Sequence, residues 1–194
     1  MEEKEEKQEK QEKEVQEEKK LIKCNYIKPR KTLNVNRLEE NQISENSEPR
    51  ILTPAEKGFE LEELLYKASL KLPGLTHSFR ENELKKHFND SSLNGIDHWI
   101  QIGETHIFIQ DKWKQSHNQQ EVSQFLNCAT RIQVRLGETS KVHLLWVSKI
   151  VPTSNSLKML QERKAHIIIQ ESSTDDLAKL CIRKILEIVS DDLF

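Results

Sequence analysis

Two neighbouring segments decide the fold of this chain, and each has the pattern of a β-strand: Gly95-Ile96-Asp97-His98-Trp99-Ile100-Gln101-Ile102 and His106-Ile107-Phe108-Ile109-Gln110-Asp111-Lys112-Trp113. Apolar and polar residues alternate along the first segment, and Gly103-Glu104-Thr105 between the two has the composition of a tight turn. The pattern predicts a β-hairpin. Because successive side chains of a strand point to opposite faces, we expect Gln110 and Lys112 on one face and Asp111 on the other.

The segments on both sides of this hairpin predict an α/β domain. Thr53-Pro54-Ala55-Glu56 has the cap, proline and acid of a helix start, and leucines at helical spacing follow it. The remaining expected elements are a strand (75–79), a helix (81–88), a helix (122–132), a strand (142–147), a helix (154–164), a strand (166–169) and a final helix capped by Ser173. This order predicts a three-layer domain in which helices flank a central mixed sheet.

The N-terminal quarter of the chain has a different composition from the rest. Residues 1–20 hold nine acidic and six basic side chains, and apolar residues stay isolated up to residue 50. Such a stretch has no face to bury, so residues 1–50 are predicted to be a disordered, charged tail and linker. The folded domain is predicted to cover residues 51–194.

Several classes of protein are excluded by composition. No apolar run approaches the roughly 18–20 residues of a membrane span, and the Glu-rich N-terminus lacks the apolar region of a secretory signal. The three cysteines, Cys24, Cys128 and Cys181, are odd in number and far apart, which fits neither a disulfide framework nor a structural zinc site. We therefore expect a protein without membrane contact in a reducing intracellular compartment, nucleus or cytoplasm.

Hairpin pairing is expected to bring Asp97 close to Gln110 and Lys112. A carboxylate and a neighbouring oxygen ligand can hold a hard divalent cation, and a lysine can orient water and offset developing negative charge. Taken singly, Asp97 also suits a turn and Lys112 a solvated strand edge. A further alternative is a zinc site, if His98 and His106 face each other across the hairpin.

The same residues resemble a known family. Gly95-Ile96-Asp97 followed by Ile107-Phe108-Ile109-Gln110-Asp111-Lys112-Trp113 looks like the Asp…Gln-x-Lys signature of the Mrr-like branch of the PD-(D/E)xK nuclease superfamily. Gly58-Phe59-Glu60 is similar to the start of the Mrr-like catalytic domain. Segments 120–125, 142–148 and 167–169 resemble the elements that complete its core, so the likeness covers residues 54–170.

The resemblance implies a restriction-endonuclease-like domain acting as a Mg²⁺-dependent DNA endonuclease, with Mn²⁺ able to substitute. It implies that Asp97, Gln110 and Glu60 hold the metal. Lys112 would orient the attacking water or stabilise the pentavalent phosphorane. The residues expected to contact DNA are Lys114, Arg131 and Trp113, and the family often cuts duplexes as homodimers. The alternative is a non-catalytic member of the fold that binds nucleic acid or protein.

Overall fold

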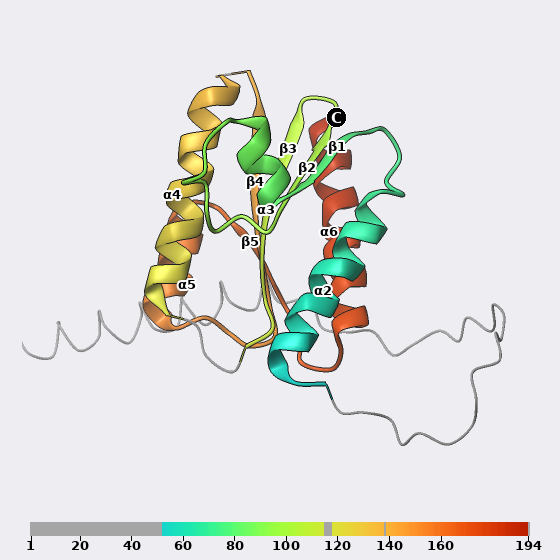
Figure 1. Cartoon of the computed structure of the whole chain (residues 1–194), viewed down its shortest axis with the longest axis vertical. Helices are drawn as coiled ribbons and strands as arrows, with labels where there is room; N and C mark the ends of the chain where they lie inside the picture. Colours follow the sequence, from blue (N-terminus) through green and yellow to red (C-terminus); the bar gives the residue numbers. More distant parts are fainter. Residues whose placement is uncertain (1–51, 115–117, 138, 194) are drawn as a thin grey trace, which may run out of the picture.

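The computed structural model describes residues 52–114, 118–137 and 139–193, and the predicted tail over residues 1–50 lies outside these ranges. The elements are α2 (Pro54–Ser69), β1 (Leu75–Arg80), α3 (Glu81–His87), β2 (His98–Ile102), β3 (Thr105–Lys112), α4 (Gln119–Leu136), β4 (Lys141–Ser148), α5 (Ser154–Glu162), β5 (His166–Ile169) and α6 (Thr174–Leu193) (Figure 1). The predicted α/β class and order of elements are confirmed. The hairpin begins later than expected, because residues 95–97 precede β2.

The five strands form one mixed sheet in the order β1-β2-β3-β4-β5. The β1–β2 and β2–β3 pairs are antiparallel, whereas β3, β4 and β5 run parallel. The carboxyl ends of these three strands therefore meet at one edge of the sheet. This is the lower edge in Figure 1, and the N-terminal ends of α2, α4 and α6 lie beside it. Ligands of open α/β sheets usually bind at the carboxyl edge of the strands.

Each face of the sheet buries its own core. On one face, Ile107 and Ile109 of β3 pack with leucines of α2 and α6. On the other, Phe108 packs with Trp146 of β4 and Phe125 of α4. The alternation along β3 is the pleat of the strand, and it produces three layers, with helices on both faces of the sheet. The apolar segment predicted to be a central strand, β4, is buried on both faces, as its composition indicated.

Side-chain caps fix the helix starts at the lower edge. Thr53 and Glu56 form the predicted capping box of α2, with the Thr53 backbone N–H donating to the Glu56 carboxylate at 2.8 Å. Asn118 and Glu121 form a second capping box, so α4 begins earlier than its first apolar residue suggested. Both boxes hold the first turn of a helix beside the end of β3.

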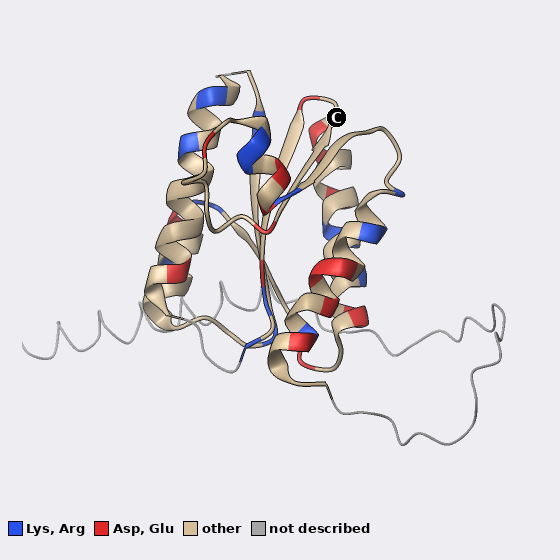
Figure 2. Ribbon diagram, in the orientation of Figure 1, with Lys and Arg blue, Asp and Glu red and all other residues tan. Residues whose placement is uncertain are grey.

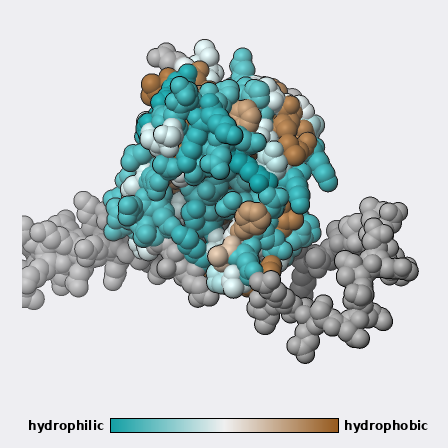
Figure 3. All heavy atoms as spheres, in the orientation of Figure 1, coloured by the Kyte–Doolittle hydropathy of each residue, from teal (hydrophilic) through white to brown (hydrophobic). Residues whose placement is uncertain are grey.

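Most apolar side chains of the domain are packed in its two cores, and the surface is correspondingly polar. The face seen in Figure 3 is mostly hydrophilic, with small hydrophobic groups toward its top, its right side and its lower right. Within the ranges that the structure describes, no helix combines the length and the apolar character that crossing a membrane requires.

Candidate active site

The hairpin brings three of the predicted site residues onto one carboxylate oxygen. The Asp97 backbone N–H donates to the Ile109 carbonyl at 2.9 Å, which continues the β2–β3 pairing and sets Asp97 opposite Gln110. Asp97 Oδ2 accepts hydrogen bonds from Gln110 Nε2 and from the Asp111 backbone N–H, the latter at 2.9 Å, and Lys112 Nζ lies 3.3 Å away. The predicted convergence of Asp97, Gln110 and Lys112 is therefore observed.

The Asp97 carboxylate is largely withdrawn from water. Its side chain is 14% exposed and that of Lys112 is 19% exposed. Burial raises the pKa of Asp97 to about 7, and the charge of Asp111 adds to the rise, while Lys112 and the Asp111 backbone N–H oppose it. Burial thus disfavours the ionised carboxylate of Asp97, and a cation bound there would favour it.

Asp111 faces the other side of the sheet, as the strand pleat predicts. Its Oδ2 lies 3.2 Å from His98 Nε2, with side chains that are 1% and 2% exposed. The two atoms are in contact, yet no hydrogen bond joins them, and His98 Nδ1 also lacks a hydrogen-bond partner within the described residues. This buried pair sits directly behind the Asp97 cluster.

The zinc alternative at His98 and His106 is wrong. His98 contacts Asp111 on the α2 side of the sheet. His106 lies on the α4 side, where its Nδ1 accepts a hydrogen bond from Trp99 Nε1 at 3.2 Å. The two rings therefore lie on opposite faces of the hairpin.

The acid that α2 brings toward the site is Glu62. Glu60, the predicted metal ligand, accepts a hydrogen bond from Thr174 Oγ1 at 2.6 Å and so joins α2 to the start of α6. Glu62 lines a cavity of about 350 Å³ together with Asp111 and Lys112. Burial and the charge of Asp111 raise the pKa of Glu62. The structure thus places Glu62, rather than Glu60, in the surroundings of Lys112.

The three residues expected to contact DNA lie in different surroundings. Lys114 follows β3 at the lower edge and pairs with Glu121 of α4. Trp113 is only 6% exposed and belongs to the core, so its ring is not open to stack on a base. It still lines cavities beside Lys114.

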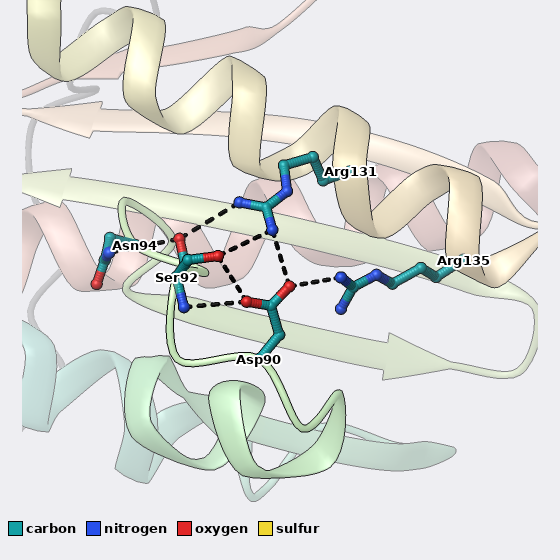
Figure 4. A network of polar contacts seen from close by, with 5 residues as sticks. All are labelled: Asp90, Ser92, Asn94, Arg131 and Arg135. Carbon is teal, nitrogen blue, oxygen red and sulfur yellow. Dashed lines mark hydrogen bonds and ion pairs between the residues drawn. The ribbon is translucent and has the colours of Figure 1, made fainter.

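Arg131 lies apart from this group. It is twelve residues beyond Gln119, the start of α4, which corresponds to roughly 18 Å along the helix. Its guanidinium binds the Asp90 carboxylate at 2.8 Å and the Ser92 hydroxyl at 2.9 Å, and Arg135 binds the same carboxylate (Figure 4). The Ser92 hydroxyl donates to the Asp90 carboxylate at 2.6 Å, and this bond, followed by that from Arg135, lowers the pKa of Asp90 to about 2. Arg131 therefore fastens the loop before the hairpin to α4.

Two further lysines were missed by sequence reasoning. Lys57 of α2 and Lys149, which follows β4, line a cavity of about 160 Å³ with Trp113 and Lys114. The one available signal was the place of Lys149 at the carboxyl end of a central strand, where ligands of α/β sheets bind. Nothing in the local sequence connects Lys57 with that strand.

The donor set limits how a metal ion would be held. Within residues 52–114, 118–137 and 139–193, no three His, Cys, Asp or Glu side chains are grouped as a metal site. An ion at Asp97 would rely on that carboxylate, the Gln110 amide oxygen after rotation of the amide, and water. Mg²⁺ fits such a set, because it often binds through one or two carboxylates and keeps several waters.

Comparison with protein families and with curated proteins identifies no relative of the chain. No protein-family model matches the chain, and no curated protein is significantly similar to it. The functional argument therefore depends on the residues at the carboxyl edge of the sheet.

Proposed function

We propose that this protein is a metal-dependent DNA endonuclease with a restriction-endonuclease-like fold. One observation carries the proposal: Gln110 and Lys112 converge on a single, partly buried carboxylate oxygen of Asp97 at the end of the hairpin. The mixed sheet, its order of elements and the position of the cluster at the carboxyl edge agree with what the family resemblance implies. DNA as substrate and a second copy of the chain as partner belong to the same proposal.

Each residue of the cluster has a distinct task in this proposal. Asp97 and Gln110, together with water, would hold Mg²⁺ or Mn²⁺, without Glu60, which binds Thr174. Such an ion supplies Lewis acidity and lowers the pKa of bound water. The ammonium group of Lys112, already 3.3 Å from the Asp97 carboxylate, would orient the attacking water and offset the charge that develops on the phosphate.

The surroundings of Asp97 support these tasks. The Asp111 backbone N–H fixes the Asp97 carboxylate by a 2.9 Å hydrogen bond. The first turns of α2 and α4 lie at the same edge, and the N-terminal end of a helix favours nearby anions such as phosphate. The chain thus positions a carboxylate for a cation and a lysine for an anion within one cluster.

A non-catalytic domain of the same fold is the second candidate. One observation favours this candidate: Asp97 Oδ2 already accepts hydrogen bonds from Gln110, the Asp111 backbone and Lys112. The hydrogen-bonding capacity of this oxygen is therefore filled by the protein itself. In this alternative the cluster only stabilises the hairpin, and the domain binds nucleic acid or protein without cleaving it.

A cleavage assay separates the two candidates. Purified protein is incubated with supercoiled, linear and branched DNA in Mg²⁺, in Mn²⁺ and in EDTA. We expect cleavage with either ion, none in EDTA, and none with Asp97→Asn. The matched control is Asp175→Asn, which makes the same change on the exposed first turn of α6 and should cleave like wild type. Intact DNA under all conditions would favour the non-catalytic domain, whereas equal cleavage by Asp97→Asn would contradict the role of Asp97 as the metal ligand.

A further inference from the structure

The lower edge of the molecule gathers lysines that the proposed chemistry does not use. Lys57 comes from α2, Lys114 follows β3 and Lys149 follows β4, and together with Pro54 and Leu52 they surround Trp113. Figure 2 shows this gathering of basic ribbon segments at the lower end of the central strands, next to the start of α2. Three separate parts of the chain thus bring ammonium groups to one cavity.

The indole of Trp113 holds two of these ammonium groups in place. Lys57 Nζ lies 5.9 Å and Lys149 Nζ 5.5 Å from the ring centroid, both within cation–π range. The ring itself is fixed, because it is packed into the core formed by α2, α6 and the sheet. The two lysines therefore have a rigid support rather than a free surface position.

Lys57 and Lys149 also differ from their neighbour Lys114 in their charge partners. Lys114 pairs with Glu121. None of the ion pairs within the described ranges involves Lys57 or Lys149. Two ammonium groups that line one cavity repel each other, and an anion bound in that cavity would relieve the repulsion.

The cavity adjoins a larger cavity that Lys112 of the candidate active site lines. It shares Pro54, Trp113 and Lys114 with the larger cavity that Asp111 and Lys112 line. The Lys149 backbone N–H donates to the Lys112 carbonyl at 3.1 Å, so the two lysines lie on directly bonded segments. An extended polyanion reaching Lys112 would pass this cavity.

We propose that Lys57, Lys149 and Trp113 form a seat for a backbone phosphate of the nucleic-acid strand, next to the phosphate that Lys112 contacts. The inference rests on the proposed function, since it assigns how the same edge holds its substrate. A phosphate group suits the site because it is compact and anionic and accepts hydrogen bonds from ammonium groups. The seat needs no metal ion, so it can be tested apart from cleavage.

The test is DNA binding in EDTA, measured by fluorescence anisotropy of a labelled duplex over a series of NaCl concentrations. For Lys57→Gln/Lys149→Gln we expect about tenfold weaker binding and a log–log salt slope reduced by about 1, the contribution of one phosphate contact. Lys57→Arg/Lys149→Arg should bind like wild type because it keeps both charges. The matched control, Lys71→Gln/Lys86→Gln, removes the same charge at two exposed lysines that line neither cavity.

Besides unchanged binding by Lys57→Gln/Lys149→Gln, three outcomes would overturn the seat: equal loss in the control pair, loss in the arginine pair, or competition by poly-glutamate as strong as by DNA. Equal loss in the control pair would show that the lysines act only through the net charge of the protein. Loss in the arginine pair would show that they act through packing, and strong competition by poly-glutamate would indicate an acidic protein partner. If the wild type binds DNA through these lysines but cleaves nothing in Mg²⁺, the seat stands and the proposed cleavage fails. If the lysine-to-glutamine variant binds and cleaves like wild type, the seat fails and the proposed function stands.

Discussion

An aspartate lies on each face of the sheet at the end of β3, and the surroundings of the two carboxylates differ. On the α4 side, the Asp97 carboxylate meets a lysine and retains access to solvent. On the α2 side, the Asp111 carboxylate is sealed against His98 and is almost inaccessible. The strand pleat places the two carboxylates on opposite faces of the sheet. They still interact electrostatically, because the charge of Asp111 contributes to the raised pKa of Asp97. The buried acid thus contributes to the raised pKa of the acid that we propose as the metal ligand.

The largest effect on stability is expected from Asp111→Asn. The change leaves the volume almost unaltered but removes the charge that His98 contacts, so a buried polar ring loses its partner. We expect the free energy of unfolding to fall by about 1–3 kcal/mol. Urea unfolding at constant pH measures this, and an unchanged midpoint would show that the His98–Asp111 contact does not stabilise the fold.

The same substitution on the other face, Asp97→Asn, should have the opposite sign. The folded-state pKa of Asp97 is raised from 3.8 to about 7, so the folded protein binds this proton more tightly than the unfolded chain. The contribution of Asp97 to stability is therefore greatest below about pH 4, declines as the pH rises to about 7, and is constant above that. At higher pH we expect Asp97→Asn to be more stable than wild type, by on the order of 1–2 kcal/mol.

Thermal unfolding over a series of pH values checks this sign. The difference between Asp97→Asn and wild type should grow from about pH 4 to about pH 7 and then level off. A variant that is less stable than wild type at neutral pH would mean that the bonds from Lys112, Gln110 and the Asp111 backbone outweigh the burial of the charge.

A smaller effect is expected from Gln110→Glu, which adds an acid on the Asp97 side alone. A carboxylate beside a divalent cation binds it more tightly than an amide dipole does, so Mn²⁺ affinity should rise about tenfold. The gain should disappear in the double variant with Asp97→Asn. Unchanged affinity in the single variant would show that residue 110 does not face the ion, and the non-catalytic domain would become the better account.

The hairpin and its site geometry could be predicted because they depend on short-range rules. Alternation and the turn at residues 103–105 set the register, and the register places Asp97 opposite Gln110 and directs Asp111 away. The same rules predicted the capping box at Thr53, since it involves residues of one helix turn.

The rest of the site depends on how separate elements pack. Both Glu60 and Glu62 flank the buried Leu61, so the sequence does not decide which of them approaches β3. The choice follows from the docking of α2 on α6, where Glu60 binds Thr174. For the same reason, the meeting of Lys57 and Lys149 at Trp113 is a property of the folded chain alone.

Calorimetric titration with Mn²⁺ tests the metal site at Asp97 most directly. It compares wild type, Asp97→Asn and the control Asp175→Asn at about pH 8, above the raised pKa of Asp97, so that no proton competes with the ion. We predict that wild type and the control bind Mn²⁺ alike, that Asp97→Asn loses this binding, and that wild-type affinity falls as the pH drops below about 7. Equal binding by wild type and Asp97→Asn would contradict the assignment of Asp97 as the metal ligand.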